Sequence, residues 1–192
     1  CVRGCRPLPS IGLVDHQGRT AGPLCGDGQM RAVASIALVL VGAALDLGAK
    51  TWARASLEPY GPPTDFLPLV PLRLTFNNGV SFSMFAVDGE IGKAVLIGVT
   101  GILTLVVAMW AYCSRGWQRT ALSMILAGAL GNLIDRSLRG VVTDFLSLRL
   151  GEWEPFVFNP ADVWISSGVA LLLVLQTTQS RAAEPGDGTS AR

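Results

Sequence analysis

Four apolar stretches constrain the fold of this chain more than any other feature. Residues 94–112 contain no Asp, Glu, Lys or Arg, and three further apolar runs cover residues 32–45, 121–134 and 163–175. About twenty apolar residues are needed to cross a bilayer, and the helical pattern of the first run continues to Trp52. Half of the residues are hydrophobic and the mean hydropathy is +0.46, as in polytopic membrane proteins. The sequence therefore predicts four transmembrane helices.

The segment before the first apolar run has a different composition. Residues 1–29 are rich in Gly, Pro and Arg and have no hydrophobic period, which is typical of disorder. Met30 and Arg31 follow directly, and we hypothesise that natural translation starts at Met30. The first run also has the basic start of a signal peptide, but its helical pattern continues without a clear cleavage site. We expect three parts: a disordered extension (1–29), one membrane domain (30–178) and a disordered polar tail (179–192).

Charge, cysteines and histidine exclude several functions. The net charge is +1, and no basic patch predicts a nucleic-acid partner. The four cysteines show no CxxC or Cys/His spacing typical of zinc, so we expect no metal and no cofactor; they are Cys1, Cys5, Cys25 and Cys113. The single histidine, His16, lies in the expected extension. If that extension is outside the fold, any chemistry must come from Asp, Glu, Lys, Ser, Asn or Arg.

The segment between the third and fourth apolar runs concentrates the ionisable residues. Ionisable groups in and beside membrane spans are functional by default. Asn159-Pro160 predicts a helix N-cap followed by Pro at the first helical position. That cap would put Asp162 in the first turn, where negative charge is stabilised. Asp144 follows an apolar Val-Val-Thr run, which would raise the pKa of its carboxyl group.

Asp144 and Asp162 are the candidate catalytic pair. If folding brings the two carboxyl groups together, they share one proton. The ionised member would take a proton from water, while the protonated member would hydrogen-bond a scissile carbonyl and protonate the leaving amine. Asp135 competes for this role, although its neighbour Arg136 suits a structural ion pair better. Spacing leaves a catalytic pair and a structural network equally open.

Two further features precede the second span. Residues 72–76 and 80–84 alternate apolar and polar side chains around Asn77-Asn78-Gly79, which predicts a β-hairpin; the proline-rich residues 59–71 before it read as a loop. The fold class is therefore an all-α membrane protein of four transmembrane helices with a small β-hairpin. Asp46 and Lys50 are four apart on one helix face, and both a structural ion pair and a direct functional role stay open for them.

Topology follows weakly from charge. Four spans put both termini on one side of the membrane. That side holds eight of the fifteen Lys and Arg residues, so the positive-inside rule hardly distinguishes the two orientations. We place the termini in the cytoplasm. The long connectors, residues 51–93 and 137–160, then face the opposite side of the membrane.

Four sequence blocks, in order, resemble the lipoprotein signal peptidase (signal peptidase II) family. The first is Asp46 with Lys50, similar to the family's Asp-x-x-x-Lys, and the second is Phe76-Asn77-Asn78-Gly79-Val80-Ser81-Phe82, similar to Asn-x-Gly-x-x-Phe. The third joins Gly128–Arg136 to Gly140-Val-Val-Thr-Asp144-Phe145, and the fourth is Phe158-Asn159-Pro160-Ala161-Asp162. Val80-Ser81 departs from the small Ala-Ala often found there, and residues 1–29 have no counterpart.

The resemblance implies an aspartyl peptidase of the bacterial cytoplasmic (inner) membrane with its active site near the extracytoplasmic face. It would remove signal peptides from prolipoproteins before a diacylglyceryl-modified cysteine, with these substrates and membrane lipid as partners, as a monomer. The resemblance assigns Asp144 and Asp162 as the catalytic dyad, makes the hairpin an extracytoplasmic cradle, and carries Asp135 over as structural. The implied support and positioning residues are Asp46, Lys50, Asn77, Gly79, Asn132, Arg136 and Asn159.

Three rival functions use the same residues differently. A small transporter or channel subunit could relay ions through Asp46, Lys50, Asp135 and Asp144, although the polar groups cluster at one membrane face and no span is broken by paired Gly or Pro. A Ser/Lys peptidase would pair Lys50 with Ser81 or Ser83. A non-catalytic membrane scaffold would tolerate conservative Asp→Asn changes.

Overall fold

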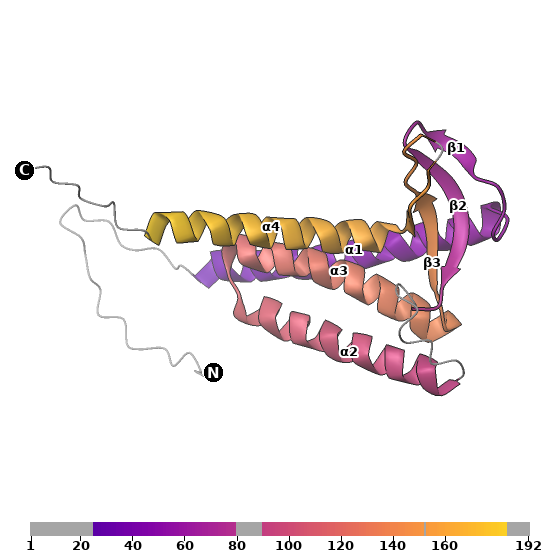
Figure 1. Cartoon of the computed structure of the whole chain (residues 1–192). Coiled ribbons are helices and arrows are strands. Elements are labelled where there is room, and N and C mark those ends of the chain that lie inside the picture. Colours follow the sequence, from indigo (N-terminus) through magenta and orange to yellow (C-terminus); the bar gives the residue numbers. More distant parts are fainter. Residues whose placement is uncertain (1–24, 80–89, 152, 184–192) are drawn as a thin grey trace, which may run out of the picture.

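Four helices lie along one another and a small sheet crosses one end of the bundle (Figure 1). This computed structural model describes residues 25–79, 90–151 and 153–183. Its helices are α1 (Cys25–Ser56), α2 (Glu90–Cys113), α3 (Gly116–Arg139) and α4 (Pro160–Ala183). Each covers one of the four predicted runs and extends it at both ends. Cys25–Gln29 of the expected extension and residues 179–183 of the expected tail are helical.

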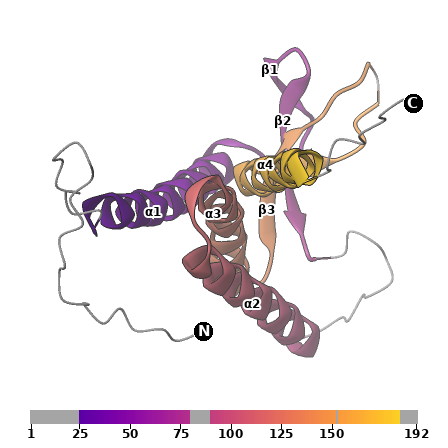
Figure 2. The same cartoon turned by 90° about the vertical axis from the view of Figure 1, so that its left-hand side faces the viewer.

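Helix α3 packs against the three other helices, and Figure 2 shows it between them. Small residues allow the close approach that the sequence suggested. A Cβ atom on Gly128 would collide with the carbonyl oxygen of Ala161 in α4, and one on Gly131 would lie 2.5 Å from Asp46 Oδ2 in α1. The α3 helix therefore brings α1 and α4 close to the same point near the sheet.

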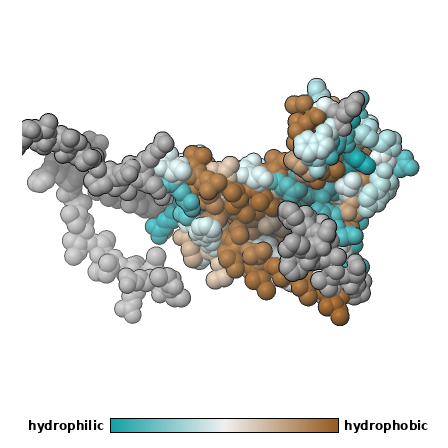
Figure 3. Space-filling view, in the orientation of Figure 1, coloured by the Kyte–Doolittle hydropathy of each residue, from teal (hydrophilic) through white to brown (hydrophobic). Residues whose placement is uncertain are grey.

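Among the described residues, three helices are long and apolar enough to cross a membrane: Gln29–Ser56 of α1, Ile91–Cys113 of α2 and Pro160–Thr178 of α4. Helix α3, which carries Arg119, Asp135, Arg136 and Arg139, is not one of them. Many large apolar side chains on the helices are exposed, among them Leu40, Ile102, Leu105, Met109 and Leu173. Figure 3 shows this brown surface along the bundle. Such a surface fits a multi-pass membrane protein.

The sheet is larger than the predicted hairpin and differs in its pairing. Four antiparallel strands follow the order β1 (Thr64–Leu67), β2 (Val70–Asn77), β3 (Val142–Ser147) and β4 (Val157–Phe158). The predicted strand 72–76 lies within β2, but its neighbours are β1 and β3; residues 80–84 lie outside the described residues. The prediction of a single hairpin was therefore wrong, because the structure has a four-stranded sheet in which β2 lies between β1 and β3. The loop reading of 59–71 was also wrong, because that segment contains β1 and the start of β2.

One core cluster fastens the sheet to α1. Leu72 and Leu74 of β2 and Phe145 of β3 are buried against Ala53 of α1. Thr143 and Asp144, the two residues of β3 before Phe145, are also buried, although consecutive strand side chains point to opposite faces of the sheet. The apolar face of the sheet therefore fixes β3 beside α1, α3 and the first turn of α4.

Candidate active site

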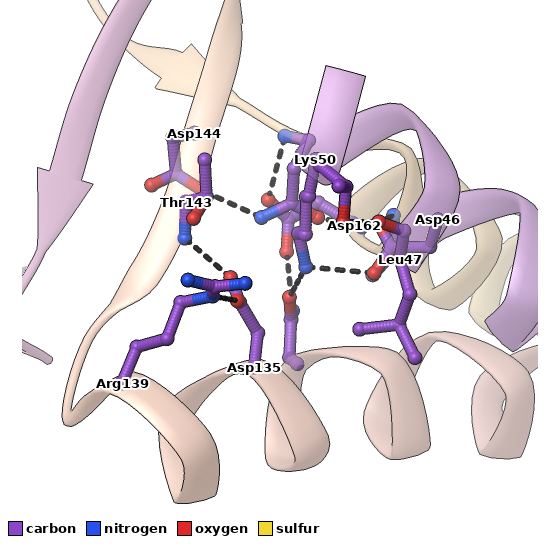
Figure 4. A network of polar contacts seen from close by, with 12 residues as sticks. Asp46, Leu47, Lys50, Asp135, Arg139, Thr143, Asp144 and Asp162 are labelled. Carbon is purple, nitrogen blue, oxygen red and sulfur yellow. Dashed lines mark hydrogen bonds and ion pairs between the residues drawn. The ribbon is translucent and has the colours of Figure 1, made fainter. Parts of the chain in front are cut away.

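Polar side chains from five elements meet where the sheet crosses the helix bundle (Figure 4). They come from α1, β2, α3, β3 and the start of α4, and most are buried. The described members of this site are Asp46, Lys50, Arg54, Asn77, Asn132, Asp135, Arg136, Arg139, Thr143, Asp144, Asn159 and Asp162.

Asn159 joins the two candidate catalytic aspartates. Its Nδ2 donates to Asp144 Oδ1 at 2.5 Å, and its Oδ1 accepts from the backbone N–H of Asp162 at 3.2 Å. The backbone N–H of Asn159 in turn donates to Asp162 Oδ2 at 3.2 Å. This reciprocal pair of bonds is a capping box, so the prediction of Asn159 as N-cap and Pro160 as the first helical residue is confirmed. The cap that starts α4 thus also holds the side chain of Asp144.

A chain of buried polar contacts leads from α1 to Asp162. Lys50 Nζ donates to Asp46 Oδ2 at 2.7 Å and to Asn132 Oδ1 at 2.6 Å. Asn132 Nδ2 then donates to Asp162 Oδ1 at 3.1 Å. Asp46 Oδ1 accepts from the backbone N–H of Ala161 at 2.9 Å. Asp46 and Lys50 are fully buried, so α1 fixes both the backbone and the carboxylate of the α4 first turn.

Burial raises the pKa of Asp144 to about 6, and the nearby charge of Asp162 adds to this rise. Hydrogen bonds from Asn159 and Asn77 and the charge of Lys50 oppose it. Asp162 has a different environment, because it accepts two N–H donors at a helix N-terminus, where negative charge is stabilised. The surroundings therefore favour a proton on Asp144.

Arg136 and the β2 end complete the surroundings of Asp144. Arg136 is buried and interacts electrostatically with Asp144, Asp135 and Asp162. Its Nε has no hydrogen-bond partner among the described residues. Asn77 Oδ1 accepts from Gly79 N at 2.8 Å, which makes it a turn residue as well as a partner of Asp144. Gly79 has a φ of +87°, and a Cβ there would collide with Leu96 of α2.

Asp135 lies in a separate group of polar contacts, and the sequence predicted the ion pair in it but not the partners. Its Oδ2 accepts from Thr143 N at 2.8 Å, and its Oδ1 pairs with Arg54 Nη1 at 3.0 Å and Arg139 Nε at 3.2 Å. The expected ion pair is present, but its partners are Arg54 and Arg139 and not the neighbouring Arg136. Arg54 Nη1 also donates to Thr143 Oγ1 at 2.6 Å.

Arg54 and Thr143 were missed as members of the site. Thr143 precedes Asp144 in β3, so the bonds from Asp135 and Arg54 to Thr143 fix the strand one residue from that aspartate. The i, i+4 spacing of Arg54 from Lys50 on the same helix face was the available signal. Within the described ranges, no cluster of three or more His, Cys, Asp or Glu side chains is arranged to hold a metal ion.

This arrangement suits acid–base hydrolysis of an amide. The raised pKa of Asp144 suits a general acid, and the Asp162 carboxyl group beside it accepts two N–H donors at a helix N-terminus. Both are fixed by neighbours that are themselves hydrogen-bonded. Ser81 and Ser83, the serines of the rival peptidase, lie outside the described residues.

Comparison with known proteins identifies a family for this chain. Residues 38–178 match a family model described as signal peptidase (SPase) II. A lipoprotein signal peptidase from Mesorhizobium japonicum is 36% identical over 145 residues, which are 75% of this chain and 86% of that protein. One from Hydrogenovibrio crunogenus is 34% identical over 146 residues, 74% of this chain and 84% of that protein.

Solved structures share the fold. A bacterial membrane enzyme determined by the in meso method at 2.3 Å resolution superposes with a TM-score of 0.68 at 23% identity, over 80% of this chain and 93% of the other. A second, at 1.9 Å resolution, has a TM-score of 0.65 at 24% identity, over 74% of this chain and 92% of the other.

Proposed function

The chain belongs to the signal peptidase II family, aspartic peptidases that remove signal peptides from prolipoproteins, and we propose that Asp144 and Asp162 are its catalytic pair. The observation that carries this assignment is the Asn159 side chain, which hydrogen-bonds Asp144 and the first turn that holds Asp162. The raised pKa of Asp144 beside an aspartate with two N–H donors adds the difference in protonation that the reaction requires.

The proposed reaction proceeds by direct attack of water. Ionised Asp162 takes a proton from water as the oxygen attacks the scissile carbonyl carbon, and protonated Asp144 donates a hydrogen bond to the carbonyl oxygen. When the tetrahedral intermediate collapses, the C–N bond breaks and a carboxyl group returns the proton to the leaving amine. Asn132 and Asn159 orient the pair, while Asp46 and Lys50 brace α4 from α1. Arg136 and Asn77 face Asp144, and Gly79 lets the Asn77 turn approach α2.

The proposed membrane arrangement has four spans, with α3 as the fourth. Three of the four charged residues of α3 lie in its last two turns, where Asp135 and Arg136 are buried against neighbouring elements, and Arg119 lies in its first turn. The sheet and the polar site then lie at one membrane face. We assign this face to the extracytoplasmic side of the bacterial cytoplasmic (inner) membrane, with the termini in the cytoplasm.

The proposed substrate class is a prolipoprotein whose cysteine carries a diacylglyceryl group, cut immediately before that cysteine by a monomeric enzyme. Lipid chains anchor such a cysteine at the membrane surface, the level at which the sheet meets the helices. Each buried methylene contributes about 0.8 kcal/mol to membrane affinity, so the lipid supplies binding energy and fixes the height of the scissile bond.

Cleavage of matched substrates tests this function. The purified protein in detergent would receive one prolipoprotein with and without the diacylglyceryl group, and products would be separated on a gel. The proposal expects cleavage of the lipidated form alone; equal cleavage of both forms contradicts the substrate class. Replacing Ser81 and Ser83 by Ala should leave the rate unchanged, and loss of activity would favour the Ser/Lys mechanism.

A further inference from the structure

The end of the sheet farthest from the site carries a cluster of large apolar side chains that the proposed reaction does not use. They belong to β1, the β1–β2 turn and the segment between β3 and β4, and each is at least half exposed. We call them the tip patch: Phe66, Leu67, Leu69, Leu150, Trp153 and Phe156. Monomeric soluble surfaces rarely gather so many exposed apolar groups at one place.

The two segments of the tip patch are fastened together, so the patch is one surface. Arg149 N donates to the carbonyl oxygen of Leu69 at 2.9 Å, and Arg149 Nη1 pairs with Asp65 of β1 at 2.9 Å. Leu148 N donates to the Phe156 carbonyl oxygen at 3.1 Å. The ring of Phe156 lies 6.2 Å from that of Phe158 in β4. Each apolar segment is therefore tied to the sheet by backbone bonds, and its side chains remain exposed.

The position of the tip patch relates it to the helices. Strands β2 and β3 run across the bundle axis, and the β1 end of the sheet projects sideways past the first turn of α4 (Figure 1). Figure 3 shows brown atoms on the side of this projection that faces back along the helices and teal atoms on its opposite side. A bilayer around the exposed apolar flank of the bundle would have its surface opposite that brown side.

The chemistry of the patch matches a bilayer surface. Tryptophan and tyrosine are enriched at the membrane–water boundary, and Trp153 of the patch is exposed. Arg73 and Arg149 lie beside the patch and are paired with carboxylates, Arg73 with Glu154 and Arg149 with Glu154 and Asp65, so the expected affinity for the bilayer comes from the apolar side chains. We propose that the tip patch rests in the headgroup region of the bilayer and holds the sheet on the membrane surface.

This contact would have a consequence for the site. The segment that carries Leu150, Trp153 and Phe156 continues directly from β3, the strand that carries Asp144. Anchoring that segment at the lipid surface fixes the height of Asp144 relative to the membrane. The occupant of the patch is bilayer lipid, and its presence requires neither substrate nor another protein.

Fluorescence quenching of Trp153 tests the proposal. The protein and its Trp153→Phe variant would be placed in vesicles of phosphatidylglycerol and phosphatidylcholine, and the difference between their emission spectra isolates Trp153. Quenching would be compared for phosphatidylcholine brominated near the headgroup, phosphatidylcholine brominated near the chain end, and aqueous iodide. Glu58→Trp is the matched control, because Glu58 is exposed two residues after the end of α1 and lies outside the tip patch.

We expect Trp153 to be quenched several-fold more by the shallow bromolipid than by iodide, without substrate, and the tryptophan at position 58 to show the reverse. Strong iodide quenching of Trp153 with no bromolipid effect would overturn the proposal. Bromolipid quenching that appears only after a lipidated substrate is added would also overturn it, since the patch would then be a substrate site. An unchanged Trp153→Phe circular dichroism spectrum verifies the fold of the reference protein.

Discussion

The side chain of Asn159 bonds both aspartates of the proposed pair: its amide nitrogen lies 2.5 Å from Asp144 Oδ1, and its amide oxygen lies 3.2 Å from the backbone nitrogen of Asp162. One residue therefore caps α4 and holds the Asp144 carboxyl group of the neighbouring strand, where its hydrogen bond opposes the rise in pKa that burial causes. The two roles are separable, because serine is a good N-cap but is too short to replace the amide donor to Asp144.

Replacing Asn159 by Ser and by Ala should separate capping from catalysis. Asn159→Ala loses the cap and should destabilise the protein by about 1 kcal/mol, whereas Asn159→Ser should retain most of the stability. Burial raises the pKa of Asp144 and the Asn159 bond opposes that rise, so both variants should raise the pKa further. The alkaline limb of kcat/KM against pH should then move to higher pH. A limb that stays in place in both variants would contradict the assignment of Asp144 as the acid.

Asp144 should cost stability at neutral pH. Its pKa is 3.8 in ordinary surroundings and about 6 in the fold. Its stabilising contribution is therefore complete below pH 3.8, declines as pH rises through this window, and is lost above about pH 6. Asp144→Asn keeps an oxygen acceptor for Asn159 without the buried charge. Thermal unfolding at neutral pH should show the variant stabilised by roughly 1–3 kcal/mol, with the difference shrinking toward acidic pH. A less stable variant at neutral pH would contradict this account.

Lys50 should be structurally indispensable. It is fully buried between Asp46 Oδ2 and Asn132 Oδ1, so Lys50→Met leaves the Asp46 carboxylate without its counter-ion. Breaking such a pair costs about 3–5 kcal/mol, which thermal unfolding in detergent would measure. The double variant Asp46→Asn with Lys50→Met removes both charges and should recover a large part of that loss. Equal loss in the single and double variants would show that the charge pairing is unimportant.

Arg54 should position Asp144 without contacting the substrate. It bonds Thr143 Oγ1 and Asp135 Oδ1, and a hydrogen bond involving a charged group contributes about 1.5–3 kcal/mol. Arg54→Gln should lower kcat about tenfold or more while KM stays near its original value, and Thr143→Val should act in the same direction. The loss of kcat in the double variant should be smaller than the product of the two single losses, since both changes break the same Arg54–Thr143 contact. Arg115→Gln, at an exposed position, is the control; a raised KM in Arg54→Gln would contradict a positioning role.

Much of the helical part of the fold could be predicted, because apolar runs and caps are local signals. The uncharged run 94–112 lies inside α2, and Asn159-Pro160 marks the start of α4. The sheet could not be predicted in the same way. Thr75 pairs with Asp144, and Leu72 pairs with Leu146, across a large sequence separation. Period-2 alternation identifies a strand, but it carries no information about a partner so far along the chain.

The sequence predicted which residues belong to the site better than it predicted which of them contact one another. Family motifs selected Asp46, Lys50 and Asn132, and the structure joins them in one chain of hydrogen bonds. Arg54 was missed because an arginine near a helix end also reads as a topology signal. Asp135 was assigned the wrong partner, since sequence adjacency to Arg136 says little about direction: neighbouring side chains on a helix point about 100° apart, whereas Arg139 lies one turn away on the same face.

Cleavage by aspartate variants tests the central claim most directly. The purified protein, Asp144→Asn and Asp162→Asn would each receive a diacylglyceryl-modified prolipoprotein, and the gel shift of the released product would be followed with time. Asp65→Asn, at an exposed aspartate paired with Arg149, is the control for loss of a carboxylate. The account predicts cleavage by the wild type and by Asp65→Asn and none by the other two, with all four proteins folded. Cleavage by Asp144→Asn or Asp162→Asn near the wild-type rate would contradict the catalytic pair.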